Sequence, residues 1–362
     1  LVSTQYAGFS RLEAFLILEC NTIMYPLRFE PFFQRYIWGG RGLASTLNKP
    51  IGDQTAAESW EIVDHCDGQS VVANGPLAGK TLHELVVEYD EQLVGPRVWS
   101  LINDTSLPPN LRLRFPLLMK FLDAQRSLSV QVHPDDALGA KLNPPDLGKT
   151  EAWYVLDVQP GAKIFAGLKS GVTRDQFAAA IETGEVEPLL HSFEPQRGDC
   201  VFIEAGTMHA IGAGLLIAEI QQASNTTYRV FDWNRVDAEG NSRPLHIAQA
   251  LAATHFDRGP VSPAISSVDS SGHQTLVDCD QFVMQRWELS KETAVACEGE
   301  FKIVVCTRGA VEVVDNRHPV TLKLGQTVLL PASLSNVCLR PLSDAAGADA
   351  AEVLVIASGN RA

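Results

Sequence analysis

The sequence predicts a mainly β protein that consists of two β-modules and a few short helices. Short apolar or alternating runs, separated by Gly, Pro, Asn and Asp, fill most of the 362 residues. Such runs are typical of antiparallel sandwiches and barrels. A chain of this length exceeds one ordinary core, so we expect two domains of roughly 100 to 250 residues. Residues 198–209 and 325–336 share one residue pattern, and this internal repeat supports the same division.

The two repeat segments each begin with a turn glycine and continue into a short apolar strand. They read GDCVFIEAGTMH and GQTVLLPASLSN, and they end in His209 and Asn336. Histidine is a common metal ligand, so we predict a functional first copy and a structural second copy. The Gly-, Pro- and Ser-rich stretch RGPVSPAISSVDSSGHQ predicts the boundary between the modules. We therefore assign residues 24–260 to the first domain and 261–362 to the second.

Residues 1–23 are predicted to be a leader or a non-native extension without ordered structure. Their apolar stretch, AFLIL, lies between Glu13 and Glu19 and follows no basic start, which does not match a secretory signal. We expect the chain proper to begin at Met24.

Three segments show helical signals. Residues 79–94 carry apolar side chains at helical spacing, and residues 243–256 do the same. Residues 173–184 begin with a Thr-x-x-Gln capping box and end at Gly184, which marks both ends of a short helix.

The overall composition limits the classes of partner. A formal net charge of −14 excludes nucleic acid and anionic membrane as main partners, but a few local cations can still bind a small anion. Seven scattered cysteines without a CxxC pair indicate reduced thiols, so we expect a cytoplasmic protein. No apolar run reaches the roughly 20 residues of a membrane span.

The stretch VQVHPDD, residues 130–136, predicts a polar strand face. Alternate side chains of a strand point the same way, so Ser129, Gln131 and His133 project together. The stretch GKTEAWYVL places Lys149 and Glu151 on one face in the same manner. Polar side chains on a face that should be buried indicate a site.

Three further polar residues lie near strand ends: His209 in GTMHAIG, and Glu219 and Arg229 in IAEIQQASNTTYRVFDWNR. Two histidines, a carboxylate and the Gln131 amide oxygen form a donor set for a divalent ion, with zinc first and iron or manganese as competitors. Each residue also has a plainer interpretation: a hydrogen-bonded histidine, a solvent-facing acid, or an arginine paired with Asp232. From the residues alone, both interpretations stay open.

Several long motifs, in the same order along the chain, give the sequence a family resemblance. They are YIWGGRGL, ESWEI, VANGP, PLLMKFLDA, LSVQVHPDD, GKTEAWYVL, GTMHAIGAGLLIAEIQQASNTTYRVFDW and RPLHIAQAL. With these motifs the chain resembles the short bacterial form of type I mannose-6-phosphate isomerase (phosphomannose isomerase). The resemblance is strong over residues 25–260 and general beyond them.

This resemblance implies two cupin-like (jelly-roll) β-barrel modules, of which only the first carries a metal site. It implies one zinc ion per chain and interconversion of mannose 6-phosphate and fructose 6-phosphate. The motif positions imply His133, Glu151, His209 and Gln131 as metal ligands, with Gln131 as a direct or an indirect ligand. They also imply that Arg229 and Lys149 act in catalysis and, with Ser129, bind the substrate.

The isomerase chemistry needs residue types that are present. Moving a proton between C1 and C2 passes through an enediol with negative charge on oxygen, which a divalent ion and Arg229 can stabilise. Glu219 is a candidate base for the proton transfer. A non-haem iron oxygenase and a non-catalytic sugar-phosphate-binding protein are the alternatives. We expect a sugar phosphate as the small-molecule partner, and a monomer or weak homo-oligomer.

Overall fold

A computed structural model describes residues 24–236, 240–335, 337–343 and 350–359. The proposed leader, residues 1–23, and Asn336 of the second repeat segment lie outside these ranges.

The N-terminal module consists of two facing antiparallel sheets and a small hairpin. The six-stranded sheet has the order β1 (Phe32–Gln34), β2 (Glu58–Ile62), β5 (Leu117–Ala124), β12 (Leu215–Gln222), β7 (Glu151–Val158) and β10 (Cys200–Ile203). The five-stranded sheet has the order β13 (Tyr228–Phe231), β6 (Val130–Val132), β11 (His209–Ile211), β8 (Ile164–Leu168) and β9 (Leu190–Phe193). The hairpin pairs β3 (Asp64–His65) with β4 (Gly68–Gln69). A shared apolar cluster that includes Val155, Ile217 and Ile164 fills the space between the two sheets.

The C-terminal module also has two antiparallel sheets. One has the order β14 (His273–Asp278), β15 (Phe282–Leu289), β22 (Ala351–Ser358), β17 (Lys302–Arg308) and β20 (Thr327–Leu330). The other has the order β16 (Thr293–Val295), β21 (Val337–Pro341), β18 (Ala310–Val314) and β19 (Val320–Lys323).

Eight strands of each module follow one topology. The orders β5-β12-β7-β10 and β6-β11-β8-β9 recur as β15-β22-β17-β20 and β16-β21-β18-β19, with the strands in the same sequence order. This is a jelly-roll arrangement in duplicate. The two repeat segments supply β10 and β20, which lie at corresponding sheet edges, so the predicted repeat of two β-modules is confirmed.

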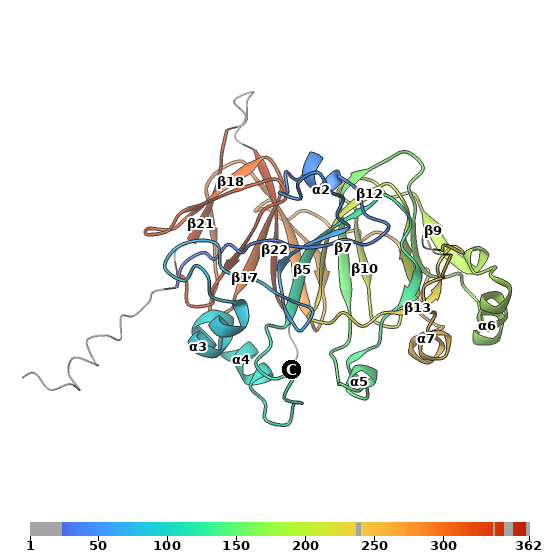
Figure 1. The fold of residues 1–362 in the computed structure, drawn as a ribbon. Helices are drawn as coiled ribbons and strands as arrows, with labels where there is room; N and C mark the ends of the chain where they lie inside the picture. The colour runs from blue at the N-terminus through green and yellow to red at the C-terminus, as the bar shows by residue number, and fades with distance from the viewer. Residues whose placement is uncertain (1–23, 237–239, 336, 344–349, 360–362) are drawn as a thin grey trace, which may run out of the picture.

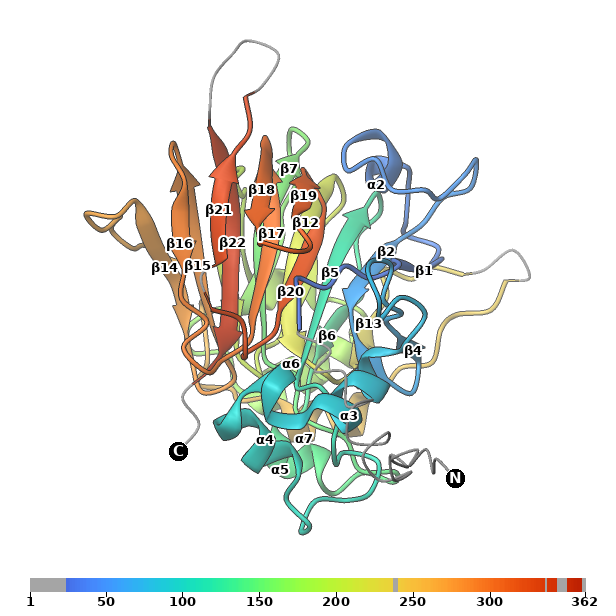
Figure 2. The same ribbon diagram turned by 90° about the vertical axis from the view of Figure 1, so that its left-hand side faces the viewer.

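The two modules pack through their larger sheets, which lie side by side in Figures 1 and 2. Leu117, Met119 and Phe121 of β5 belong to the same buried cluster as residues 353–356 of β22. The Tyr154 hydroxyl donates to Glu352 Oε1 across this contact at 2.7 Å. The opposite face of the six-stranded sheet is therefore left to face the interior of the N-terminal module. We retain 24–260 and 261–362 as the proposed extents of the domains.

The helices lie outside the sheets. They are α2 (Gly42–Ser45), α3 (Leu82–Val94), α4 (Pro96–Ile102), α5 (Asp136–Gly139), α6 (Arg174–Thr183), the 3-10 helix η1 (Glu187–Leu189) and α7 (Ile247–Ala253). Helix α6 has the predicted Thr173–Gln176 capping box and ends at Gly184 in a left-handed conformation. No helix in the described ranges is long and apolar enough to cross a membrane.

The short helices α2, α5 and η1 were not predicted, and two longer helices also differ from the sequence prediction. Helix α7 begins only at Ile247: the backbone angles of His246 are not helical, and Arg243 reaches back to an ion pair with Asp232. Helix α4 was not predicted; it begins at Pro96 directly after Gly95, where a proline at the first helical position is favourable.

Candidate active site

Strand β6 presents two chemically different faces, as its alternation predicts. Val130 and Val132 are fully buried in an apolar cluster that also holds Phe177 of α6. Ser129 and Gln131 line a cavity on the other face, and the Ser129 hydroxyl donates to Gln131 Oε1 at 3.2 Å. The polar triplet of the sequence therefore faces the interior of the N-terminal module.

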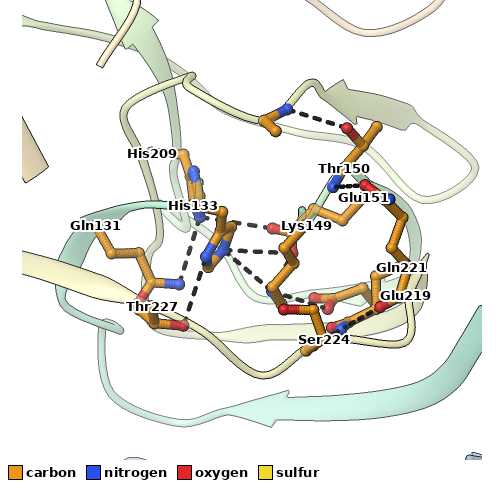
Figure 3. Close-up of polar contacts among 12 residues, drawn as sticks. Gln131, His133, Lys149, Thr150, Glu151, His209, Glu219, Gln221, Ser224 and Thr227 are labelled. Atoms are coloured by element: carbon orange, nitrogen blue, oxygen red, sulfur yellow. Dashed lines mark hydrogen bonds and ion pairs between the residues drawn. The ribbon is translucent and has the colours of Figure 1, made fainter. Parts of the chain in front are cut away.

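Three side chains of types that can ligate a metal converge at the buried end of this cavity, which Glu151 lines. His133 follows β6, Glu151 begins β7 and His209 begins β11. Their ligating atoms lie within 4.8 Å of one another, and all three side chains are buried. Figure 3 shows the three side chains pointing toward one another, with the two histidines at the five-stranded sheet and Glu151 on the facing six-stranded sheet. In the described part of the chain, His65, Cys66 and Asp67 form one further such group, of which two members are exposed.

Both histidines are held in the tautomer whose Nε2 carries no proton and can accept from a donor or bind a metal ion. His133 Nδ1 donates to the Thr226 carbonyl at 2.9 Å, and His209 Nδ1 donates to the Thr207 carbonyl at 2.8 Å. Metal-ligating histidines almost always donate their second ring nitrogen in this way. Burial and the neighbouring Lys149 lower the pKa of His133 to about 3, and burial also lowers the pKa of His209. Both rings are therefore neutral, which is the form that binds metal.

Glu151 completes a donor set of two imidazoles and one carboxylate. Its two oxygens each lie 3.5 Å from one histidine Nε2. Burial opposes ionisation, but Lys149 and the two histidines hold the pKa of Glu151 well below its ordinary value. The ammonium of Lys149 contacts both Glu151 and His133 Nε2, so a cation already sits beside these donors. The residues present therefore fit a divalent ion such as zinc.

Gln131 lies beside this donor set but turns the other end of its amide toward it. Its Nε2 lies 3.3 Å from His209 Nε2, while its oxygen accepts from Ser129. Ligation of a metal ion by the Gln131 oxygen would require the amide group to turn over.

A buried network of alternating charges extends from the donor set along the cavity wall. Glu219 Oε1 lies 3.1 Å from Lys120 Nζ and 3.8 Å from Lys149 Nζ. Trp153 Nε1 donates to Glu219 Oε2 at 3.0 Å. Burial and the nearby Glu151 raise the pKa of Glu219 to about 7. This carboxyl can therefore take up or release a proton near neutral pH.

Lys120 links Glu219 to a third carboxylate. Its ammonium lies 3.4 Å from Glu58 Oε2, and Glu58 also accepts from Trp60 Nε1 at 2.6 Å. Burial disfavours the charge on Lys120, but Glu219 and Glu58 outweigh it and raise the pKa of Lys120. The lysine is therefore a permanent cation in the cavity wall.

The mouth of the cavity carries two arginines. Arg229 on β13 donates from Nε to the Ser129 hydroxyl at 3.0 Å and from a terminal nitrogen to the Pro244 carbonyl at 3.2 Å. Asp232 does not pair with Arg229 as the plainer interpretation supposed. It accepts instead from Arg235 and from Arg243, whose Nε donates at 2.7 Å. Arg243 lines the cavity, whereas Arg235 does not.

The loop after β12 is held by one partly buried acid, Asp146. It accepts from Arg114 at 3.0 Å, from the Ser224 hydroxyl at 2.9 Å and from the Thr226 hydroxyl at 2.8 Å. Since the Thr226 carbonyl orients His133, Asp146 positions a candidate ligand through two hydrogen bonds. Asp135 and Asp136 of the HPDD turn are likewise structural: Asp135 caps α5, and Asp136 accepts from the Gly148 amide.

All the residues predicted for the site lie together, and the cavity has a volume of about 280 Å³. The lining includes Ser129, Gln131, Lys149, Glu151, Glu219 and Arg229. Sequence reasoning missed Lys120, Glu58, Arg243 and Tyr36, which also line it. A lysine within the fully buried strand LLMKFLDA was a usable signal for Lys120. Trp38 is buried and also lines the cavity.

The chain is similar to known proteins of one family. Residues 27–154 match the family described as phosphomannose isomerase type I, catalytic domain, and residues 272–340 match mannose-6-phosphate isomerase, cupin domain. The chain is 36% identical over 311 residues to mannose-6-phosphate isomerase ManA of Bacillus subtilis, covering 85% of this chain and 94% of that protein. It is 33% identical over 312 residues to mannose-6-phosphate isomerase of Streptococcus mutans, covering 86% and 94%. The crystal structure of mannose 6-phosphate isomerase from Bacillus subtilis superimposes with a TM-score of 0.79 at 31% identity, covering 92% of this chain and 99% of that one.

Proposed function

Because the chain belongs to the type I mannose-6-phosphate isomerase family, we propose that it interconverts mannose 6-phosphate and fructose 6-phosphate. The observation that carries this proposal is a single cavity with a metal-binding donor set at its inner end and two arginines at its mouth. This separation suits a substrate whose carbonyl end and phosphate end differ in chemistry. The cavity is close to the lower size limit of small-molecule sites, which suits a hexose phosphate.

We assign the metal site to His133, Glu151 and His209, with Gln131 beside them, and one ion per chain. Two neutral imidazoles and a carboxylate favour zinc, while ferrous iron and manganese accept the same donors. A bound divalent ion supplies Lewis-acid polarisation of the sugar oxygen at C1 or C2.

The proton transfer is assigned to Glu219. The reaction moves one proton between C1 and C2, so its base must accept and return a proton near neutral pH. A pKa of about 7 gives Glu219 that property, and its contact with Lys120 holds the carboxylate in place. Lys149 and Lys120 then stabilise the negative charge that develops on the enediol oxygens.

The phosphate is assigned to the mouth of the cavity. Arg229 carries planar donors beside the Ser129 hydroxyl, and Arg243 lies at the same mouth. Arginine forks bind phosphate through paired, charge-assisted hydrogen bonds. These local cations explain how a chain of net charge −14 can bind an anionic sugar. Free thiols among the described cysteines support a cytoplasmic location.

The test is a coupled assay of fructose 6-phosphate formation from mannose 6-phosphate, run before and after chelation. Turnover should be lost on chelation and restored best by zinc, in comparison with manganese and ferrous iron. His209→Ala should abolish it, while His83→Ala, at a histidine of α3 outside the cavity, should not. Absence of turnover with metal demonstrably bound would contradict the isomerase assignment. Oxygen uptake by the iron-loaded protein would favour the oxygenase alternative.

A further inference from the structure

The C-terminal module contains a cavity at the position that corresponds to the active site. The register of the sheets establishes this correspondence residue by residue. Lys120 pairs with Glu219, which pairs with Trp153 across β5, β12 and β7. Across β15, β22 and β17, the same three positions hold Gln285, Val355 and Val304.

The lysine and the carboxylate of the active site have exchanged places in the second module. Ile203 of β10 pairs with Glu151, and the corresponding Leu330 of β20 pairs with Lys302. Glu300, two residues before Lys302, corresponds to Lys149. The Lys-x-Glu sequence that leads into β7 is therefore replaced by a Glu-x-Lys sequence that leads into β17. Lys302 Nζ lies 3.3 Å from Glu300.

The second cavity is larger than the first, with a volume of about 370 Å³. Small side chains line one of its sides: Ala294, Ala296 and Ala357. Trp287 and His273 line another side and stack on each other, with ring centroids 3.9 Å apart and an angle of 8° between their planes. Ala294 and Ala296 correspond to Ser129 and Gln131 of the active site. Because alanine is smaller than serine or glutamine, the β16 side of the second cavity is wider.

A few polar groups converge on this largely apolar cavity. The Gln285 amide oxygen accepts from Trp287 Nε1 at 3.1 Å. The Lys302 ammonium has Glu300 as its partner among the described residues, and it is 17% exposed, so it has hydrogens to donate to a ligand. Arg97 of α4 holds Glu300 at 3.0 Å and the Ser358 hydroxyl at 2.7 Å, which fixes the carboxylate at the cavity wall.

These groups define a ligand class. An aromatic wall packs against the C–H face of a sugar ring, while an ammonium, a carboxylate and an amide exchange hydrogen bonds with its hydroxyls. Neither metal-ligating group of the described residues lies here, so a ligand would bind without a metal. We propose that this cavity is a second, non-catalytic binding site for a monosaccharide or its phosphate. The proposal does not depend on the isomerase activity of the first cavity.

Fluorine NMR of protein labelled with 5-fluorotryptophan separates the two sites in one spectrum. Among the six tryptophans, Trp287 alone belongs to the C-terminal module, and Trp38 and Trp153 line the first cavity. The zinc-loaded protein would be titrated with mannose and, separately, with mannose 6-phosphate. We expect a saturable shift of the Trp287 resonance, assigned with Trp287→Phe.

Two variants locate the binding. Ala294→Phe, at an exposed alanine of the cavity, should weaken the Trp287 titration at least tenfold, while Trp38 and Trp153 still respond to mannose 6-phosphate. Thr321→Phe, at an exposed position of β19 outside the cavity, should leave the Trp287 titration unchanged. Lys302→Met should abolish the preference for the phosphorylated sugar if the ammonium binds phosphate. If mannose and mannose 6-phosphate instead shift the Trp287 resonance with equal affinity, the Lys302 ammonium binds a sugar hydroxyl. Both results support the site.

Two results would overturn the proposal. One is a Trp287 resonance that stays fixed under both ligands while Trp38 and Trp153 respond. The other is a Trp287 titration that is the same in Ala294→Phe and Lys302→Met as in the parent protein. If Trp287 responds and the first-cavity tryptophans do not, the second site stands and the isomerase assignment fails.

Discussion

The two modules share one eight-strand topology but fill the same inward positions with different chemistry. In the N-terminal module, the six-stranded sheet presents Lys120, Glu219 and Glu151 to the cavity. In the C-terminal module, the corresponding residues are Gln285, Val355 and Lys302. The strand order thus provides a cavity in both modules, and the side chains decide whether it can hold a metal ion. Fold alone does not determine function here.

Exchanging the charge order of the active site should have the largest effect. The double substitution Lys149→Glu/Glu151→Lys gives the first module the Glu-x-Lys order of the second. It replaces a metal-ligating carboxylate by a cation, so bound zinc should be lost. Turnover should fall by more than about 100-fold, which exceeds the effect of losing a residue that only hydrogen-bonds to a metal ligand. Metal analysis and the coupled assay measure both quantities.

The matched control exchanges an exposed ion pair, Lys80→Glu/Glu88→Lys, and should keep metal and turnover. Circular dichroism and thermal unfolding show whether the swapped active-site variant is folded. A folded variant that still binds zinc with parental affinity would contradict the assignment of Glu151.

Arg243 tests whether the mouth of the first cavity recognises phosphate. Arg243→Gln removes one charge-assisted contact, which corresponds to roughly 1.5 to 3 kcal/mol, or about 10- to 150-fold in affinity. We expect KM for mannose 6-phosphate to rise within this range while kcat changes little. Arg235→Gln is the control, because Arg235 also pairs with Asp232 but does not line the cavity. An equal rise in KM for both variants would indicate that the arginines act by pairing with Asp232 and not by binding the phosphate.

A variant of Asp146 tests whether this residue holds His133 in its orientation. Asp146→Asn weakens the hold on Thr226, whose carbonyl orients the His133 ring. Loss of such an outer partner should lower zinc affinity by about 10- to 100-fold. Competition with a chromogenic chelator measures this affinity, and Asp135→Asn, at the exposed cap of α5, is the control. An affinity within threefold of the parent would show that the loop is held by other contacts.

The extent to which sequence predicted this site depends on how local each signal is. Ser129, Gln131 and His133 were placed on one face because strand alternation is a property of consecutive residues. The ends of α6 were equally local, since Thr173, Gln176 and Gly184 lie within one short segment. The roles of these residues came from the family resemblance, not from the alternation.

The residues that sequence reasoning missed depend on contacts between distant segments. Lys120 faces Glu58 and Glu219, which are 62 and 99 positions away, and only the sheet order brings them together. The apolar residues at helical spacing that follow Arg243 predict a helix that includes it. In the structure α7 begins only at Ile247, and Arg243 forms an ion pair with Asp232 instead. Tertiary contacts outweigh local propensity at such positions.

The smallest predicted effect concerns α6, a helix without a counterpart in the described residues of the C-terminal module. Its residues Phe177 and Ile181 pack with Val130 and Val132, on the face of β6 opposite to Gln131. Thr173→Ala removes the N-cap and should lower the free energy of unfolding by about 1 kcal/mol. Urea unfolding measures this, and Thr81→Ala at the matching capping box of α3 is the comparison. Because the valines stay buried when a cap is lost, zinc affinity and kcat should not change. A fall in zinc affinity with Thr173→Ala alone would mean that α6 holds β6, and with it His133, in register.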